Sequence, residues 1–327
     1  MRCPGCGRES AEQSVFCTYC GVRMQPEVRV ENAAIGAELG ELREVLSRRR
    51  RTDRRLPPWA VVVPFVITML FAIVLVGAVF DRILDYDLSG GEMPTEEEIL
   101  GDMDPYIVAA VVFNVLFYAV YAVLAYLMVD RANRHLEREA AAMDAVGKVL
   151  GKLGGARSLA SDPWGREQVL DGRAAYGTKR NPLLWAAVIA LPLIGSLAED
   201  FAILNDDFGL SNSLQIVSIP IMLVHVVLMF YFLHIMSDDT WKHDQAWTEF
   251  ARGTKVALAR AGGTAGALDE GTTLPSRPTG LFVVVSLITL GLFLVYWWYV
   301  ALKDPNEHYG KQARFEDQLV AMLSGKD

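Results

Sequence analysis

Long apolar runs dominate the chain, and charged flanks separate them. Each run is 22 to 24 residues long: 59–80, 106–129, 183–204, 214–236 and 280–302. A helix rises about 1.5 Å per residue, so each run is long enough for about 30 Å of hydrocarbon. Because a backbone in lipid must satisfy its own hydrogen bonds, these runs predict helices. We expect an all-α membrane protein with about five transmembrane or re-entrant helices.

The charges between the runs are unevenly distributed, and this predicts an orientation. Residues 48–55 hold six arginines and one aspartate, whereas residues 81–105 hold nine acidic side chains and one arginine. Short flanks rich in Lys and Arg stay in the cytoplasm. We therefore expect a multi-pass protein of the cell membrane with a cytoplasmic N-terminus and an acidic outer loop. No signal-peptide pattern precedes the runs, so we expect the mature chain to begin at Met1.

All four cysteines of the chain lie in residues 1–26. They form two C-x2-C pairs separated by ten residues: Cys3, Cys6, Cys17 and Cys20. Each pair can direct two thiolates at one tetrahedral ion, and a reducing cytoplasm favours a metal over disulfides. We expect Zn²⁺ here. Iron and a redox dithiol are the alternatives, since the same ligands support them.

The same 26 residues resemble the short N-terminal zinc ribbons of prokaryotic proteins, many of which are membrane-bound. Phe16, directly before the second cysteine pair, matches that pattern. A ribbon offers a small rigid surface to a protein or nucleic-acid partner. Eleven arginines nearly balance eight acidic residues over 1–58, which does not favour nucleic acid. We expect a cytoplasmic protein partner instead.

Residues 27–56 read as a basic linker with a helical middle. Its apolar positions recur at i, i+4, i+7 and i+11 and form one stripe: Ile35, Leu39, Leu42 and Leu46. We expect this stripe to pack on the zinc ribbon or the membrane domain; a two-heptad coiled coil that makes a dimer is the alternative. The arginines at 48–51 directly precede an apolar run, so topology and anionic lipid explain them better than nucleic acid.

A short pattern recurs three times around the apolar runs. Arg and Pro precede an apolar entry at 55–57, 180–182 and 277–278. Each exit has an aspartate four or five residues before a histidine: Asp130/His135, Asp238/His243 and Asp304/His308. A charged helix follows each exit, and we interpret the pattern as a threefold repeat.

The repeat divides the remainder of the chain into membrane units and connectors. The expected parts are a first membrane hairpin with its cytoplasmic helix (57–153), a cytoplasmic connector (154–179), a second hairpin with its helix (180–262), a flexible linker (263–276) and a last membrane segment with a C-terminal amphipathic helix (277–327).

The last unit raises a conflict, because residues 280–302 are too few for two spans. Five simple spans would put the C-terminus outside, whereas the repeat requires it inside. A break between Ser286 and Gly291 would make a re-entrant hairpin, provided that protein covers it. The sequence leaves this choice open.

Residues 277–303 also resemble the signature of an uncharacterised family of small multi-pass prokaryotic membrane domains. In that family an Arg precedes a Ser-Leu/Ile-Ile-Thr-x-Gly-x-Tyr-x-x-Tyr-Trp segment. The matching residues are Arg277, Ser286-Leu287-Ile288-Thr289, Gly291 and Val295-Tyr296-Trp297. Phe293 or Leu294 stands where the first Tyr and a second Gly are usual. The resemblance implies a membrane domain. It implies no activity, because none is established for that family.

Polar residues inside the apolar runs are candidates for chemistry. The candidate intramembrane site is Asn114, Glu199, Asp200 and His225. Facing inward, these side chains would line a polar path or an ion site. Small and polar residues are also the usual contact surface between membrane helices, and we favour that interpretation. We interpret the three exit histidines as interfacial side chains, too separated for a shared metal site.

The sequence does not favour an enzyme. It contains no G-x-S-x-G, no H-E-x-x-H and no phosphate-binding glycine loop, and no cysteine follows residue 20. We expect a membrane-anchored interaction or regulatory module that contacts a cytoplasmic protein through its ribbon. The alternative is a small transporter or channel that uses polar residues of the spans. Homo-oligomerisation stays open, and so does any ligand.

Overall fold

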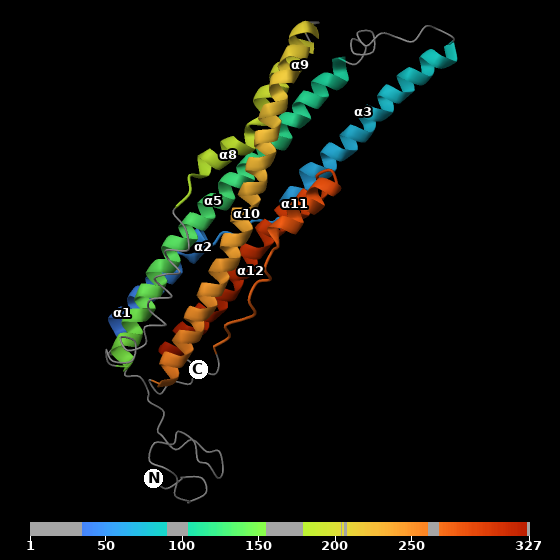
Figure 1. Cartoon of the computed structure of the whole chain (residues 1–327). Helices are drawn as coiled ribbons and strands as arrows, with labels where there is room; N and C mark the ends of the chain where they lie inside the picture. Colours follow the sequence, from blue (N-terminus) through green and yellow to red (C-terminus); the bar gives the residue numbers. More distant parts are fainter. Residues whose placement is uncertain are drawn as a thin grey trace, which may run out of the picture.

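The computed structural model describes residues 35–89, 104–154, 179–203, 205, 208–260 and 268–325. These residues form α-helices, one short 3-10 helix and connecting segments, with no β-strand among them. Figure 1 shows a long bundle whose helices run roughly along one axis. The fold is that of an all-α membrane protein, as predicted.

Four helical stretches are long and apolar enough to cross a membrane: Pro58–Asp81, Val108–Leu153, Pro182–Ile203 and Ser213–Ala259. The first contains a short 3-10 helix, η1 (Pro58–Val61), and the start of α3 (Val62–Ser89). On α3, Leu70 and Ile73 are 58 % and 62 % exposed within the protein. Apolar surface of this extent is typical of helices that lipid covers.

Two helices continue far beyond their apolar halves. α5 (Asp104–Gly154) has 51 residues and α10 (Phe208–Arg260) has 53. At about 1.5 Å per residue each is about 75 to 80 Å long, more than twice the hydrocarbon thickness. The charged helices expected after the first two exits are therefore unbroken continuations of membrane helices.

The third apolar run is interrupted. α8 (Pro182–Ala190) begins after Asn181, whose side chain accepts hydrogen bonds from two backbone N–H groups of the first turn. α9 (Pro192–Ile203) follows, because Pro192 has no N–H and crowds the preceding turn. A Cβ on Gly195 would lie 3.2 Å from Cβ of Ser218 on α10. These small residues let α9 and α10 approach closely.

The last apolar run forms a helical hairpin. α11 (Thr279–Ile288) ends in a turn, and α12 (Leu292–Leu323) returns beside it. Gly291 in the turn has a φ of 90° and donates its N–H to the Ser286 carbonyl at 2.7 Å. The Phe293 N–H donates to the Thr289 hydroxyl at 3.1 Å. Because these groups are paired within the turn, the turn is suited to an apolar layer.

The hairpin returns α12 to the level of α1 (Gly36–Ser47), the first helix among the described residues. In Figure 1 the C-terminal end of α12 lies at the same end of the bundle as α1. Four long apolar stretches and one short hairpin therefore replace five simple spans. This arrangement agrees with the repeat.

Two apolar clusters lie along the bundle. The membrane-proximal cluster includes Tyr121, Met128, Phe232, Trp297 and Leu302. The distal cluster lies beyond the membrane helices and includes Ile35, Leu39, Leu42, Leu46, Val146, Trp247 and Phe315. The stripe on α1 is buried in the distal cluster, against α5 and α12. We call this part, made of α1 and the far halves of α5, α10 and α12, the distal bundle.

The segment before α11 is anchored from residue 268 onward. Leu268 and Leu274 are 2 % and 8 % exposed, and the Leu274 N–H donates to Asp244 at 2.7 Å. Its composition led us to expect a flexible linker over 263–276. Residues 263–267 lie outside the described residues. Residues 268–278 form no helix, and two buried leucines and bonds to neighbouring helices hold them in place.

Candidate metal centre

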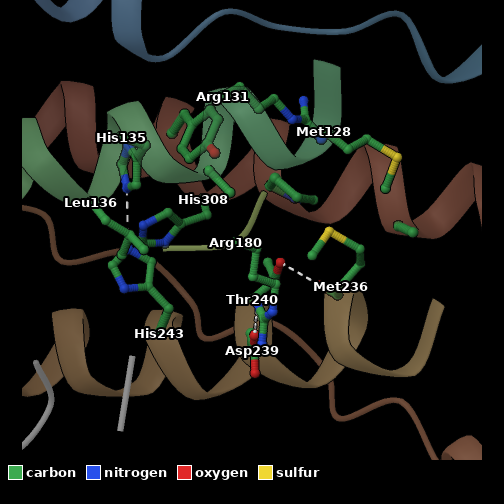
Figure 2. A pocket seen from close by; sticks show the side chains of 14 residues that line it. Met128, Arg131, His135, Leu136, Arg180, Met236, Asp239, Thr240, His243 and His308 are labelled. Atoms are coloured by element: carbon green, nitrogen blue, oxygen red, sulfur yellow. Dashed lines mark hydrogen bonds and ion pairs between the residues drawn. The ribbon is translucent and has the colours of Figure 1, made fainter. Parts of the chain in front are cut away.

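A buried polar layer lies between the two apolar clusters. His135 and Glu139 reach it from α5, His243 from α10 and His308 from α12. His135 and Glu139 are one helical turn apart and share a face. Figure 2 shows His135, His243 and His308 converging on the same region. Their ligand atoms and that of Glu139 all lie within 4.8 Å of one another, and none of the four residues is more than 7 % exposed.

The three histidines are those at the exits of the three repeat units. We had interpreted them as separate interfacial side chains, and the structure contradicts this. They meet because α5, α10 and α12 pack together where they leave the apolar layer. The threefold repeat in the sequence was a signal that the three histidines could meet. When the units of a repeat pack around one axis, their equivalent residues lie at the same height along that axis.

The distances among three of the ligand atoms are close to those around a tetrahedral ion, and the fourth atom, from His308, lies within 4.8 Å of the others. His243 Nε2 lies 3.1 Å from His135 Nε2 and 2.8 Å from a Glu139 carboxylate oxygen. That same oxygen lies 3.7 Å from His135 Nε2. Metal–ligand distances of about 2.0 to 2.1 Å place the ligand atoms of a tetrahedral zinc site about 3.3 Å apart. One ion would therefore fit among these atoms with small adjustments.

Carboxylates orient two of the three rings. His135 Nδ1 lies 3.0 Å from Asp53, and His308 Nδ1 lies 2.8 Å from Asp244. A carboxylate at Nδ1 holds the ring proton there and leaves the Nε2 lone pair free for a metal. Such support is the usual surrounding of a histidine that ligates a metal.

Two atoms of the cluster lack a hydrogen-bond partner among the described residues. They are His308 Nε2 and Glu139 Oε1, and both are buried. A buried polar atom without a partner costs about 1 to 3 kcal/mol. A metal ion would supply the missing contact.

The protonation states suit metal binding. Burial lowers the pKa of His308 to about 3, and the neighbouring His243 acts in the same direction. Burial also lowers the pKa of His135. Burial by itself would raise the pKa of Glu139, but the adjacent histidines, His243 first, lower it to about 2. Neutral imidazoles and an ionised carboxylate are the forms that bind a metal.

Further buried ion pairs surround the cluster. Arg138 contacts Asp53 at 2.9 Å and Glu316 at 2.7 Å, and Lys311 contacts Asp244 at 2.6 Å. Removing charged groups from water costs free energy, and the attraction within the ion pairs barely offsets that cost. Such a network therefore contributes little to stability. Concentrated buried titratable groups are instead typical of functional sites.

A cavity of about 60 Å³ adjoins the cluster. Its lining includes the three histidines, and Figure 2 shows them with Met128, Arg131, Met236 and Thr240 around it. Tyr309 completes the side next to His308, and its burial raises the pKa of its hydroxyl to about 12. Burial therefore keeps this hydroxyl protonated.

The predicted intramembrane residues are not brought together. His225 Nδ1 lies 3.0 Å from the Val188 carbonyl, eleven positions before Glu199. Throughout the described ranges, no hydrogen bond or ion pair joins any two of the four residues proposed: Asn114, Glu199, Asp200 and His225. The third and fourth apolar runs meet instead through small residues, Gly195 and Ser218.

The predicted zinc ligands of the N-terminal ribbon lie outside the described residues: Cys3, Cys6, Cys17 and Cys20. Most of the acidic loop and nearly all of the connector after α5 also lie outside them.

No protein-family model, no curated protein and no solved structure matches the chain.

Proposed function

We propose that the protein binds a divalent transition-metal ion, Zn²⁺, in the polar layer and acts as a membrane-anchored interaction or regulatory module. One observation carries the metal: three histidines and Glu139 from three helices offer ligand atoms within 4.8 Å of one another. The carboxylates behind His135 and His308 support the same assignment.

Zinc fits the donor set. Imidazole nitrogen with carboxylate oxygen is a common zinc environment, and the ligand set found among the described residues contains no cysteine. Iron, cobalt and copper accept imidazole as well, so metal content must be measured.

A regulatory role follows from where the ion would sit. It would join all three repeat units at one level, and through His135 it would fix Asp53 in the segment after α1. Binding of the metal ion would thus stabilise the packing of α1 within the distal bundle. The zinc ribbon precedes α1, and we propose it as a second Zn²⁺ site that docks a cytoplasmic protein.

Metal analysis of purified protein tests the site. Replacing the four cysteines with Ser removes the ribbon ligands, and we expect about one zinc ion per chain to remain. Adding His243→Ala and His308→Ala should remove that ion. His234→Ala is the matched control, because His234 contacts Thr279 at 2.8 Å, away from the cluster. Zinc retained without His243 and His308, or no zinc in the cysteine-free chain, would contradict the proposal.

A separate experiment tests the module. Affinity purification from native membranes would compare the intact protein with a Cys17→Ser, Cys20→Ser form, after insertion of both is verified. A protein partner recovered only with the intact form is the expected result. Recovery of the same partners by both forms would exclude the ribbon as the docking surface.

A further inference from the structure

A buried arginine without a counter-charge borders the cavity at the metal centre. Arg131 is 3 % exposed. Its guanidinium donates to the Asn306 side-chain oxygen at 2.9 Å and to the Leu302 carbonyl at 3.3 Å. Both acceptors are neutral. In the parts of the chain that the structure describes, no carboxylate forms an ion pair with it.

The other buried cations of the layer do have carboxylate partners. Arg138 contacts Asp53 and Glu316, and Lys311 contacts Asp244. Buried charges are normally paired, because an isolated one loses its hydration without compensation. Arg131 is the exception, and it lines the cavity.

The overall charge of the layer supports the same conclusion. Two ion pairs next to the layer are each neutral, Arg277 with Asp304 and Arg49 with Asp317. Apart from these pairs, the carboxylates with buried side chains are Asp53, Glu139, Asp244 and Glu316, and the buried cations are Arg131, Arg138 and Lys311. With neutral histidines, a divalent metal ion would leave one positive charge in excess. A monovalent anion would balance it.

The cavity has the size and position for such an anion. At about 10 to 15 Å³ per water-sized atom, its volume of about 60 Å³ holds roughly four non-hydrogen atoms. The three histidines line it and Glu139 does not. The cavity therefore lies on the histidine side of the ion, where an exogenous ligand would add as a fifth ligand.

We propose that this cavity binds a small monovalent anion, of the short-chain carboxylate class, as an exogenous ligand shared by the metal and Arg131. The inference rests on the proposed function, because the metal ion is one of the two groups that hold the anion. Apolar lining residues, Met128, Met236 and Ala301 among them, restrict the ligand to a small one.

Cobalt substitution tests the proposal. The full-length protein would be loaded with Co²⁺, whose visible absorption reports its coordination, and titrated with sodium azide and, separately, sodium acetate. We expect a saturable spectral change with both probes. Arg131→Gln should weaken azide binding at least about tenfold, since a charge-assisted contact is lost. Arg134→Gln should leave it unchanged, because Arg134 is exposed and paired with Asp130.

Each failure has a distinct meaning. A Co²⁺ spectrum that responds to neither probe, or equal azide affinity in Arg131→Gln, would overturn the anion site and leave the metal site standing. Absence of Co²⁺ binding would overturn both. Should Arg131→Gln not fold, Arg131→Lys replaces it; this variant keeps the charge but loses the planar fork, and undiminished azide affinity would again overturn the proposal.

Discussion

At the scale of single residues, Asp53 shows how the metal centre depends on a side chain outside the repeat. It follows the arginine run, and it accepts hydrogen bonds from His135 at 3.0 Å and from Thr52 at 2.8 Å. Burial by itself would raise its pKa, but the hydrogen bond from His135 and the charge of Arg138 hold the pKa below its usual value. Asp53 is therefore ionised and fixes the His135 ring.

We predict that Asp53→Asn weakens zinc binding about 10- to 100-fold, because an amide supports a metal-bound imidazole less well than a carboxylate does. The dissociation constant would be measured by competition with a chelator in the cysteine-free chain. Asp317→Asn is the control, since Asp317 is exposed and contacts Arg49. Unchanged affinity in Asp53→Asn would show that Asp53 does not support the ligand.

At the scale of elements, the α11–α12 hairpin explains the motif in the last apolar run. Ser286 and Thr289 hydroxyls donate to carbonyls one turn earlier, at 2.7 and 2.8 Å. Gly291 takes the left-handed conformation that reverses the chain. Arg277, before the hairpin, forms two 2.9 Å contacts with Asp304 after it. The motif residues thus build a turn and close its base.

We predict that Gly291→Ala destabilises the protein by about 1 to 2 kcal/mol, because any side chain is strained at this φ. The nearest atom to an added Cβ is 3.8 Å away, so strain and not crowding is the cause. Thermal unfolding in detergent measures it. Gly280→Ala, on α11 with open space around the new Cβ, should be neutral or slightly stabilising. Equal effects of the two substitutions would contradict this account.

The entry arginines and exit aspartates pair in a second unit as well. Arg180 forms an ion pair with Asp239, one residue after the Asp238 of the exit pattern. Arg277 and Asp304 form the equivalent pair in the third unit. In these two units an entry arginine therefore joins the beginning of a hairpin to an aspartate at its end, whereas Asp130 of the first unit pairs with Arg134 on its own helix.

At the scale of the whole molecule, the polar layer connects two parts that are stabilised differently. Lipid covers the apolar helices, whereas packing of α1 and three long helices forms the distal bundle. The layer between them contributes little hydrophobic burial and several desolvated charges. Without a metal ion, this level should be the weakest point of the bundle.

We predict that chelation lowers the unfolding temperature and that added zinc restores it. Zinc at about 100 times its dissociation constant should contribute about 2.7 kcal/mol. The cysteine-free chain would be unfolded thermally with and without zinc, so that only the polar layer responds. In the His308→Ala variant zinc should no longer raise the unfolding temperature, whereas in the His234→Ala variant it should raise it as in the parent chain. A gain of equal size in His308→Ala would place the zinc effect elsewhere.

We predict that both ends of the chain lie in the cytoplasm and that the acidic loop lies outside. In the cysteine-free chain, Thr95→Cys should react with an impermeant thiol reagent on intact cells, whereas Lys326→Cys should react only after permeabilisation. The arginine-rich flank and the returning hairpin are the reasons. Labelling of both positions on intact cells would favour five spans; labelling of Lys326→Cys alone would mean the inverted orientation.

The sequence by itself determined the features that depend on neighbours along the chain. The length of the apolar runs predicted membrane helices. The spacing of Leu39, Leu42 and Leu46 predicted one buried face. The segment from Ser286 to Gly291 indicated where a break could lie, but the sequence left open whether the last run spans or turns back. The paired cysteines predict a zinc ribbon in the same way. Each of these inferences needs only local geometry.

The tertiary structure alone decided which distant residues meet. His135 and His243 are 108 positions apart, yet their Nε2 atoms lie 3.1 Å from one another. The sequence placed each histidine beyond the end of an apolar run. The helices carrying it could still dock in several rotations and offsets, and only their packing fixes one of these. Burial, the carboxylates behind the rings and the unpaired Arg131 all follow from that packing, which no local pattern encodes.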